Sequence, residues 1–275
     1  MIELPEAINL ARQFDKVVRG KKIERVTAGF SPHKFAWYHG DPRDYDALLK
    51  GKTIGEAAAY GGYLEVKADG AVLIFHDGVA LRLHGKGEKR PPKHQLLIEF
   101  TDGTALSGSV QMYGGLCCAK EGEFTSRYYQ AARGKPSPLS GEFDAAYFNR
   151  LINDSEVRKL SAKAFLATEQ RIPGLGNGVL QDILFNAKID PRRKIEELTG
   201  SEKETLFRSI KSTLKEMTEQ GGRDVEKDLF GKPGGYKTIL SQNTVGNPCP
   251  VCGGVIIKQP YMGGSIYFCA GCQKL

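Results

Sequence analysis

Apolar residues recur at helical spacing near the beginning of the chain, at Leu4, Ile8, Ala11, Phe14 and Val18. Such spacing places them on one face of a helix, which is then buried. Pro5 suits the first turn of a helix, and Gly20 is a typical residue at a helix end. The pattern therefore predicts an amphipathic helix that begins at Leu4 and ends before Gly20.

The pattern changes to short β-rich runs between residue 22 and about residue 116. Asp-Gly pairs at 69–70, 77–78 and 102–103 indicate turns between them. We expect an antiparallel β-sandwich or barrel, within an N-terminal domain that spans residues 1–118. The predicted strands are Ile23–Val26, Tyr63–Val66, Val72–Phe75, Val79–Leu83, Leu96–Phe100 and Thr104–Ser107.

Helical periodicity dominates the second half of the chain. Residues 119–143 are rich in glycine and proline and are interpreted as a linker, and residues 144–240 form a second, helical domain. The fold class is therefore α+β. The predicted helices are Asp154–Leu160, Lys163–Glu169, Val179–Ala187 and the long amphipathic Glu202–Gln220.

Four cysteines close the chain as two Cys-x-x-Cys pairs, Cys249 with Cys252 and Cys269 with Cys272, separated by sixteen residues. This spacing is typical of one structural Zn²⁺ held by four thiolates, with a β-hairpin between the pairs. Two disulfides are the alternative interpretation. We expect residues 241–275 to form a zinc finger.

Composition adds a weak indication of a polyanionic partner, because the net charge is +7 and the pI about 9.0. No apolar run approaches the roughly 18 residues that a membrane span requires, and no signal peptide is recognised. We therefore expect a cytoplasmic protein that binds no membrane.

The segment Ile172-Pro-Gly-Leu-Gly176-Asn177-Gly-Val predicts two helices joined by a glycine turn. A glycine turn that leads into a helix start exposes backbone N–H groups, which can bind a phosphate. Asn177 lies at this helix start, so it either binds a phosphate oxygen or only caps the helix.

Several motifs occur together in one order: Met1-Ile-Glu3-Leu-Pro-Glu6 at the start, Pro-Gly-Leu-Gly-Asn177, Gly-Lys-Pro-Gly at 231–234, and a four-cysteine finger that ends in Cys-Gln. In this combination the chain resembles the formamidopyrimidine-DNA glycosylase/endonuclease VIII family. The resemblance implies a β-sandwich, a helix-two-turn-helix domain and a zinc finger, with double-stranded damaged or abasic DNA in the cleft between them. It further implies a monomer that flips damaged bases out of the duplex and excises them. A bacterial member would associate with the nucleoid. By position, Lys163, Gly176 and Asn177 would contact DNA phosphates.

The chain departs from the family at its nucleophile. Most members carry a proline at position 2 whose amine attacks the sugar, whereas this chain has Ile2. The free amine would then belong to Met1, displaced by about 3.5 Å along the chain, and such a displacement disrupts catalytic geometry.

Cations that the family places around the lesion are also absent. The hairpin lysine aligns with Gly62, the zinc-finger arginine with Gly264, and the arginine-bearing loop with Gln111–Gly114. Within that loop Met112 and Tyr113 remain as candidate DNA contacts, with Tyr113 as an aromatic wedge.

Glu3 aligns with the general acid/base of the family, while Glu6 is a weaker catalytic candidate. The alternative is that both carboxylates only stabilise the positive end of the first helix. Two functions follow: a DNA N-glycosylase in which Glu3 activates water and β-lyase activity is weak or absent, or a non-catalytic protein that binds damaged or branched DNA.

Overall fold

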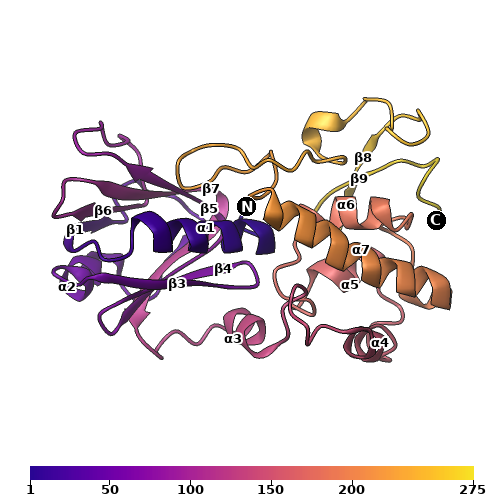
Figure 1. Cartoon of the computed structure of the whole chain (residues 1–275), viewed down its shortest axis with the longest axis horizontal. Helices are drawn as coiled ribbons and strands as arrows, with labels where there is room; N and C mark the ends of the chain where they lie inside the picture. The colour runs from indigo at the N-terminus through magenta and orange to yellow at the C-terminus, as the bar shows by residue number, and fades with distance from the viewer.

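The first helix joins the two halves of the molecule. The computed structural model describes residues 1–275 and places α1 (Leu4–Val17) at its centre (Figure 1). Leu10 and Phe14 on α1 belong to the core beneath the sheet, whereas Leu4 belongs to the core of the helical half. The predicted amphipathic helix is confirmed, and its buried face contributes residues to two hydrophobic cores.

Seven strands form one antiparallel sheet apart from a short parallel pairing of β2 with β7, in the order β1-β6-β7-β5-β4-β3. In Figure 1 the strands fold over into two layers, with β1 and β6 in one and β3 and β4 in the other. The predicted sandwich is therefore confirmed. The strands are β1 (Ile23–Ala28), β2 (Ala36–Trp37), β3 (Ile54–Tyr60), β4 (Tyr63–Ala68), β5 (Ala71–His84), β6 (Leu96–Phe100) and β7 (Ala105–Lys120), and the short helices η1 (Pro42–Asp44) and α2 (Tyr45–Leu49) lie between β2 and β3.

The predicted turn at Asp77-Gly78 is wrong, because β5 continues through it as one strand of 14 residues. The register against β7 shifts between Asp77 and Val79, which marks a β-bulge, and Asp77 has a positive φ of 58°. A Cβ at Gly78 would lie 2.6 Å from the carbonyl oxygen of Tyr113, so only glycine fits opposite the bulged residues 111–113 of β7. The Asp-Gly pair therefore bends a strand instead of ending it.

The helical half contains α3 (Arg127–Gly134), α4 (Ala145–Ile152), α5 (Ala162–Ala167), α6 (Val179–Asn186), η2 (Ile195–Glu197) and α7 (Gly200–Glu219). α3 falls within the expected linker and packs through Tyr129 and Ala132 against the sheet. The predicted helix at residues 154–160 is wrong: this segment is a series of turns. Its first residue, Asp154, accepts the N–H of Glu156 at 2.8 Å, a local bond that competes with helix formation.

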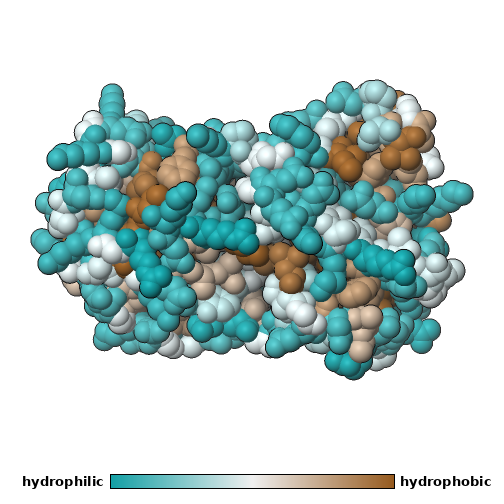
Figure 2. Space-filling view, viewed as in Figure 1, coloured by the Kyte–Doolittle hydropathy of each residue, from teal (hydrophilic) through white to brown (hydrophobic).

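The chain ends in η3 (Gln242–Thr244) and the hairpin of β8 (Ile257–Tyr261) and β9 (Gly264–Phe268), which lies beside α6. Most of the face seen in Figure 2 is hydrophilic, with apolar patches over the sheet and over the hairpin region. No helix combines the length and apolar character needed to cross a bilayer.

Candidate functional site

Glu3 caps a helix other than its own. Its carboxylate accepts the N–H of Gly178 at 2.8 Å and of Val179 at 2.7 Å, at the start of α6, while α1 begins directly after it. A Cβ on Gly176 would lie 2.6 Å from a Glu3 oxygen, so this glycine allows the carboxylate to approach. The N–H groups of Gly178 and Val179 are therefore occupied from within the chain and are not open to a phosphate.

Glu6 forms a buried ion pair with Arg223, which lies in the segment after α7. The guanidinium donates from Nε and Nη2 to the two Glu6 oxygens at 3.0 and 2.9 Å, and the Arg223 backbone N–H donates to Oε1 at 3.1 Å. Arg223 Nη1 lies 3.7 Å from Glu3, and all three side chains are almost fully buried. One arginine thus pairs directly with Glu6 and lies near Glu3, the two carboxylates that the sequence suggested for catalysis.

The pKa values of the two carboxylates are shifted in opposite directions. Burial raises the pKa of Glu3 above its ordinary value and the Glu6 charge adds to this effect, although Arg223 and the two backbone N–H groups oppose it. Burial acts in the same direction on Glu6, but the charge and hydrogen bonds of Arg223 outweigh it and lower the pKa of Glu6. Glu3 is therefore the better proton acceptor near neutral pH.

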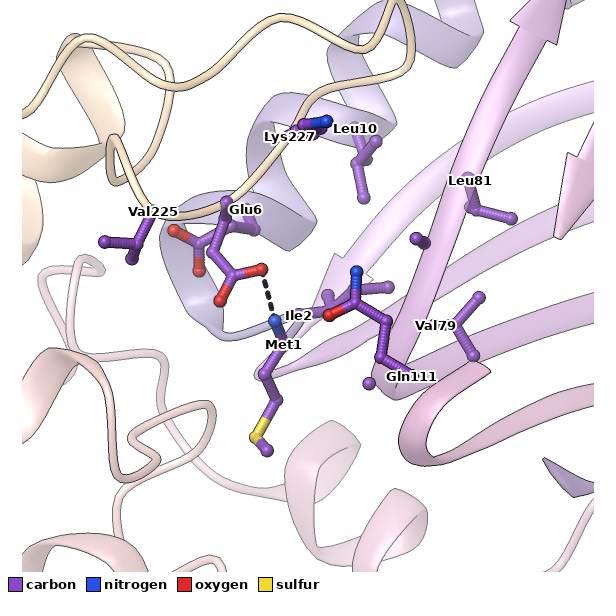
Figure 3. A pocket seen from close by; sticks show the side chains of 12 residues that line it. Met1, Ile2, Glu6, Leu10, Val79, Leu81, Gln111, Val225 and Lys227 are labelled. Carbon is purple, nitrogen blue, oxygen red and sulfur yellow. Dashed lines mark ion pairs between the residues drawn. The ribbon is translucent and has the colours of Figure 1, made fainter. Parts of the chain in front are cut away.

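The N-terminus is fixed by two polar contacts. The Met1 amino group pairs with the carboxylate of Glu226, as the dashed line in Figure 3 shows. Ile2 is buried in the core of the sheet, and its amide donates to the carbonyl oxygen of Asp77 at 2.6 Å. At this end of the chain, the structure offers the Met1 amine and not the Ile2 nitrogen to solvent.

A cavity of about 560 Å³ lies between the two halves. Met1 and Glu3 line it from the N-terminus, Met112 from β7, Asn177 from the glycine turn, and Tyr267 from the hairpin. A second cavity, of about 140 Å³, lies on the other side of Met1 and is the one drawn in Figure 3. Residues that are up to 266 positions apart in sequence thus line one cleft, among them the candidates Met1, Glu3, Met112 and Asn177.

Lys163 and Asn177 lie side by side under the tip of the hairpin. Lys163 Nζ donates to the carbonyl oxygen of Tyr261 at 2.6 Å, and Asn177 Nδ2 donates to that of Ser265 at 3.0 Å. Burial lowers the pKa of Lys163, and the Asn177 Oδ1 atom is buried without a partner. Asn177 does not cap α6, because Glu3 does so; it joins the turn to the hairpin.

Glycines pack closely at the turn where the family resemblance would place the hairpin lysine. A Cβ on Gly61 would lie 2.8 Å from the backbone nitrogen of Gly174, and one on Gly62 would lie 3.0 Å from the carbonyl oxygen of Ile2. Where the resemblance would place a lysine, the chain therefore brings the β3–β4 turn against the N-terminus and the glycine turn.

Met112 and Tyr113 do not lie in a loop. They lie within β7, in a bulge of three residues (111–113) that faces the single residue Gly78 of β5, and Met112 is 67% exposed. The expectation of a separate loop at 111–114 is therefore corrected: these residues belong to a bent strand beside the cleft.

The four terminal cysteines form one cluster that can hold a metal ion. Their sulfur atoms all lie within 4.8 Å of one another, with 3.7 Å between Cys249 and Cys272 and 3.4 Å between Cys252 and Cys269. A tetrahedral Zn²⁺ with bonds of about 2.3 Å would separate the sulfurs by about 3.8 Å. The donor set and spacing fit zinc, and the separations exceed the roughly 2.05 Å of a disulfide bond.

Sequence reasoning missed Arg223, Glu226 and Gln181. Gln181 on α6 accepts the N–H of Tyr267 at 3.0 Å and so binds the hairpin to the helix. Arg223 and Glu226 follow a Gly-Gly pair in a segment without periodicity. A charged residue in such a segment gives no signal that it is buried.

Comparisons with known proteins agree with this arrangement. Models of the formamidopyrimidine-DNA glycosylase N-terminal domain and H2TH domain match residues 1–110 and 135–228. A formamidopyrimidine-DNA glycosylase from Bacillus cereus is 30% identical over 283 residues, with 99% of each chain covered. One from Wolbachia pipientis is 31% identical over 285 residues, with both chains fully covered.

Solved structures give the same result. The MutM (Fpg) protein of Thermus thermophilus is 26% identical with a TM-score of 0.80, and 98% of each chain is covered. The Lactococcus lactis Fpg, solved with DNA that contains an abasic site, is 25% identical with a TM-score of 0.82, and 99% of this chain and 100% of that chain are covered. Together with the sequence matches, this shows that the chain belongs to the formamidopyrimidine-DNA glycosylase family.

Proposed function

We propose that the protein is a base-excision-repair protein that binds damaged or abasic double-stranded DNA and has N-glycosylase activity with little or no β-lyase activity. The observation that carries this proposal is the 560 Å³ cleft in which Glu3, Met1, Met112 and Asn177 converge. Its position between the sheet, the helices and the hairpin suits a duplex with one nucleotide turned out of the stack.

Glu3 is the proposed proton acceptor. Each of its oxygens accepts one backbone N–H, and a carboxylate oxygen has a second lone pair that can receive a proton from water. Water would then attack C1′ of the sugar, Glu3 would take its proton, and the base would leave with the electrons of the glycosidic bond. Burial of Glu3 supports this role, since a raised pKa improves a carboxylate as a base.

Weak lyase activity is proposed from the state of the amine. Attack on the sugar needs a nitrogen lone pair, and the Met1 ammonium is held by Glu226, which also lies 3.9 Å from Arg223. The Ile2 nitrogen is an amide and cannot substitute. Glu226→Gln would release the amine, and we expect it to increase covalent trapping.

The experiment combines three measurements on one abasic duplex and one duplex with an oxidised purine. Borohydride trapping measures amine attack, base release measures glycosylase activity, and anisotropy measures binding. We expect base release without trapping, and loss of release in Glu3→Gln. Glu204→Gln, an exposed change on α7, is the matched control. Efficient trapping by the wild type, or unchanged release by Glu3→Gln, would contradict the mechanism.

A non-catalytic damage-binding protein is the second candidate. The observation that favours it is that Arg223 and two backbone N–H groups already engage Glu3, which makes a purely structural role sufficient to explain its burial. Tight binding to abasic duplex without any base release would support this candidate.

The metal is proposed to be Zn²⁺ in a structural role. Four thiolates complete a tetrahedral shell and leave no open position for substrate. Cys249, Cys252, Cys269 and Cys272 would hold the hairpin strands so that Gly264 stays against Lys163. Elemental analysis of the purified protein measures the ion and its ratio to the chain.

A further inference from the structure

Four aromatic rings from four different strands form a ladder that leads from the interior to the surface. Tyr63 on β4 contacts His76 on β5, with 4.8 Å between ring centroids. His76 stacks on Trp37 of β2 at 6.2 Å and 28°, and Trp37 contacts Tyr113 of β7 at 5.6 Å. We call these four residues the aromatic ladder.

The backbone is built to admit the ladder. A Cβ on Gly115 would lie only 1.9 Å from Nε2 of His76, so a side chain at this position would displace the ring. The other ring nitrogen, Nδ1, lies 2.8 Å from the carboxylate of Asp77, which fixes the ring plane. β2 pairs with β7 at Gly114 and Gly115, and this pairing brings Trp37 over the same spot.

The inner end of the ladder opens on the candidate site. Tyr63 and His76 line a small cavity together with Met1, Glu3 and Gly176. The outer end reaches the surface, where Trp37 is 44% exposed and where Met112, the neighbour of Tyr113 in the chain, is 67% exposed. Trp37 therefore presents a partly exposed aromatic ring at the surface, and His76 and Tyr113 hold this ring in place.

We propose that Trp37, supported by Tyr113 and His76, is a stacking platform for an unpaired nucleobase of the bound DNA. This inference rests on the proposed function and extends it. A nucleobase is the occupant that fits, because the exposed face is a flat ring, the inner end of the ladder lines a small cavity together with Met1 and Glu3 of the cleft, and the chain carries a net charge of +7 that suits the phosphates on either side of the base.

Stacking would also contribute to DNA binding where the chain has few cations around the lesion. Glycines stand at 62 and 264 where the family resemblance would place a lysine and an arginine. Stacking on an aromatic ring contributes to affinity without releasing counterions, so this platform makes binding less dependent on salt than phosphate contacts do.

Trp37 is the only tryptophan in the chain, which gives the test a signal from the platform itself. The full-length protein is titrated with abasic duplex, intact duplex and single strand of one sequence, while tryptophan emission and the anisotropy of labelled DNA are recorded. We expect quenching of the emission by abasic duplex and single strand, and much less by intact duplex at equal occupancy.

Substitutions test whether the contact contributes to affinity. Trp37→Ala is expected to weaken binding of abasic duplex by roughly 5- to 100-fold, and Trp37→Phe to restore most of it. Phe30→Ala is the matched control, because this ring is 61% exposed but stacks on His94 and lies outside the ladder. Circular dichroism checks that each variant is folded.

The outcomes separate this proposal from the proposed function. DNA binding with unchanged tryptophan emission, or equal affinity of Trp37→Ala and wild type, would overturn the platform and leave the repair function standing. Equal quenching by intact duplex would show that Trp37 contacts DNA without stacking on an unpaired base. Absence of binding to every DNA would refute both proposals.

Discussion

Replacing Arg223 with methionine tests whether one buried arginine holds the two halves together. The side chain is 2% exposed, donates to both oxygens of Glu6 and lies 3.7 Å from Glu3. Methionine has a similar length, so the change removes the charge and leaves two carboxylates buried without a cation. Breaking a buried pair in this way costs about 3–5 kcal/mol, a large part of the roughly 5–15 kcal/mol that stabilises a typical protein.

The effect has a defined pH dependence. Arg223 lowers the pKa of Glu6, so the stability that this pair contributes is present above the ordinary value of 4.5 and is lost as the pH falls through the lower, folded value. In Arg223→Met the pKa of Glu6 rises, because the charge and the side-chain hydrogen bonds of the guanidinium are lost while burial remains. The difference between wild type and variant should therefore be largest near pH 7 and should shrink as the pH approaches 4.

Urea unfolding at several pH values measures the loss of stability in Arg223→Met and its dependence on pH. Arg223→Lys, which keeps the charge but not the two-pronged geometry, should lose less stability than the methionine variant. Arg208→Met is the matched control, since its pair with Glu204 is 72% and 62% exposed and should be worth less than about 1 kcal/mol. A loss below about 1 kcal/mol in Arg223→Met, or one that does not shrink on acidification, would refute the reasoning.

Three further changes test other parts of the molecule. Gly264→Arg should tighten binding to abasic duplex and raise the salt slope by about one, because it adds a cation at the hairpin tip. A side chain fits there, since a Cβ would make ordinary contact at 3.5 Å with Lys163 Nζ. Gly264→Ala is the control, and an unchanged slope would show that the hairpin tip does not reach phosphate. Removal of the metal by a chelator should unfold the hairpin and weaken DNA binding while the sheet persists, as limited proteolysis and anisotropy would show. Burial raises the pKa of Asp182 from 3.8 to about 6, so its contribution to stability is present below about pH 4 and is lost as the pH rises through 6. The free energy of unfolding of wild type relative to Asp182→Asn should therefore fall by on the order of 3 kcal/mol between pH 4 and pH 7, and a constant difference would contradict this assignment.

Local patterns in the sequence predict a structural feature correctly where one short segment determines that feature. The cysteine spacing predicts the metal cluster because each pair supplies two ligands from one turn. The periodicity of Leu4 to Val18 predicts α1 because a single face is buried along its length. The Asp77-Gly78 pair misled because pairing of β5 with β7 resumes directly after it, so the strand continues where the local sequence indicates a turn.

Long-range contacts could not be predicted from local patterns. Glu3 stands at the start of α1, and nothing near it in sequence indicates that it caps α6, 175 residues away. A helix cap was one of two roles that the sequence allowed for Asn177, and the carboxylate of Glu3 takes that role instead. Arg223 is buried by partners whose position depends on the whole fold, so its local sequence carries no sign of them.

The pairing of Glu6 with Arg223 has a consequence for synthesis of the protein. The two residues are separated by 217 positions, so at roughly 5–20 residues per second the arginine leaves the ribosome about 10 to 40 seconds after the glutamate. During that interval α1 cannot bury its acidic end without a counter-charge. The sheet can form early, but the N-terminus must remain open until the last third of the chain arrives, and the candidate site is completed only then.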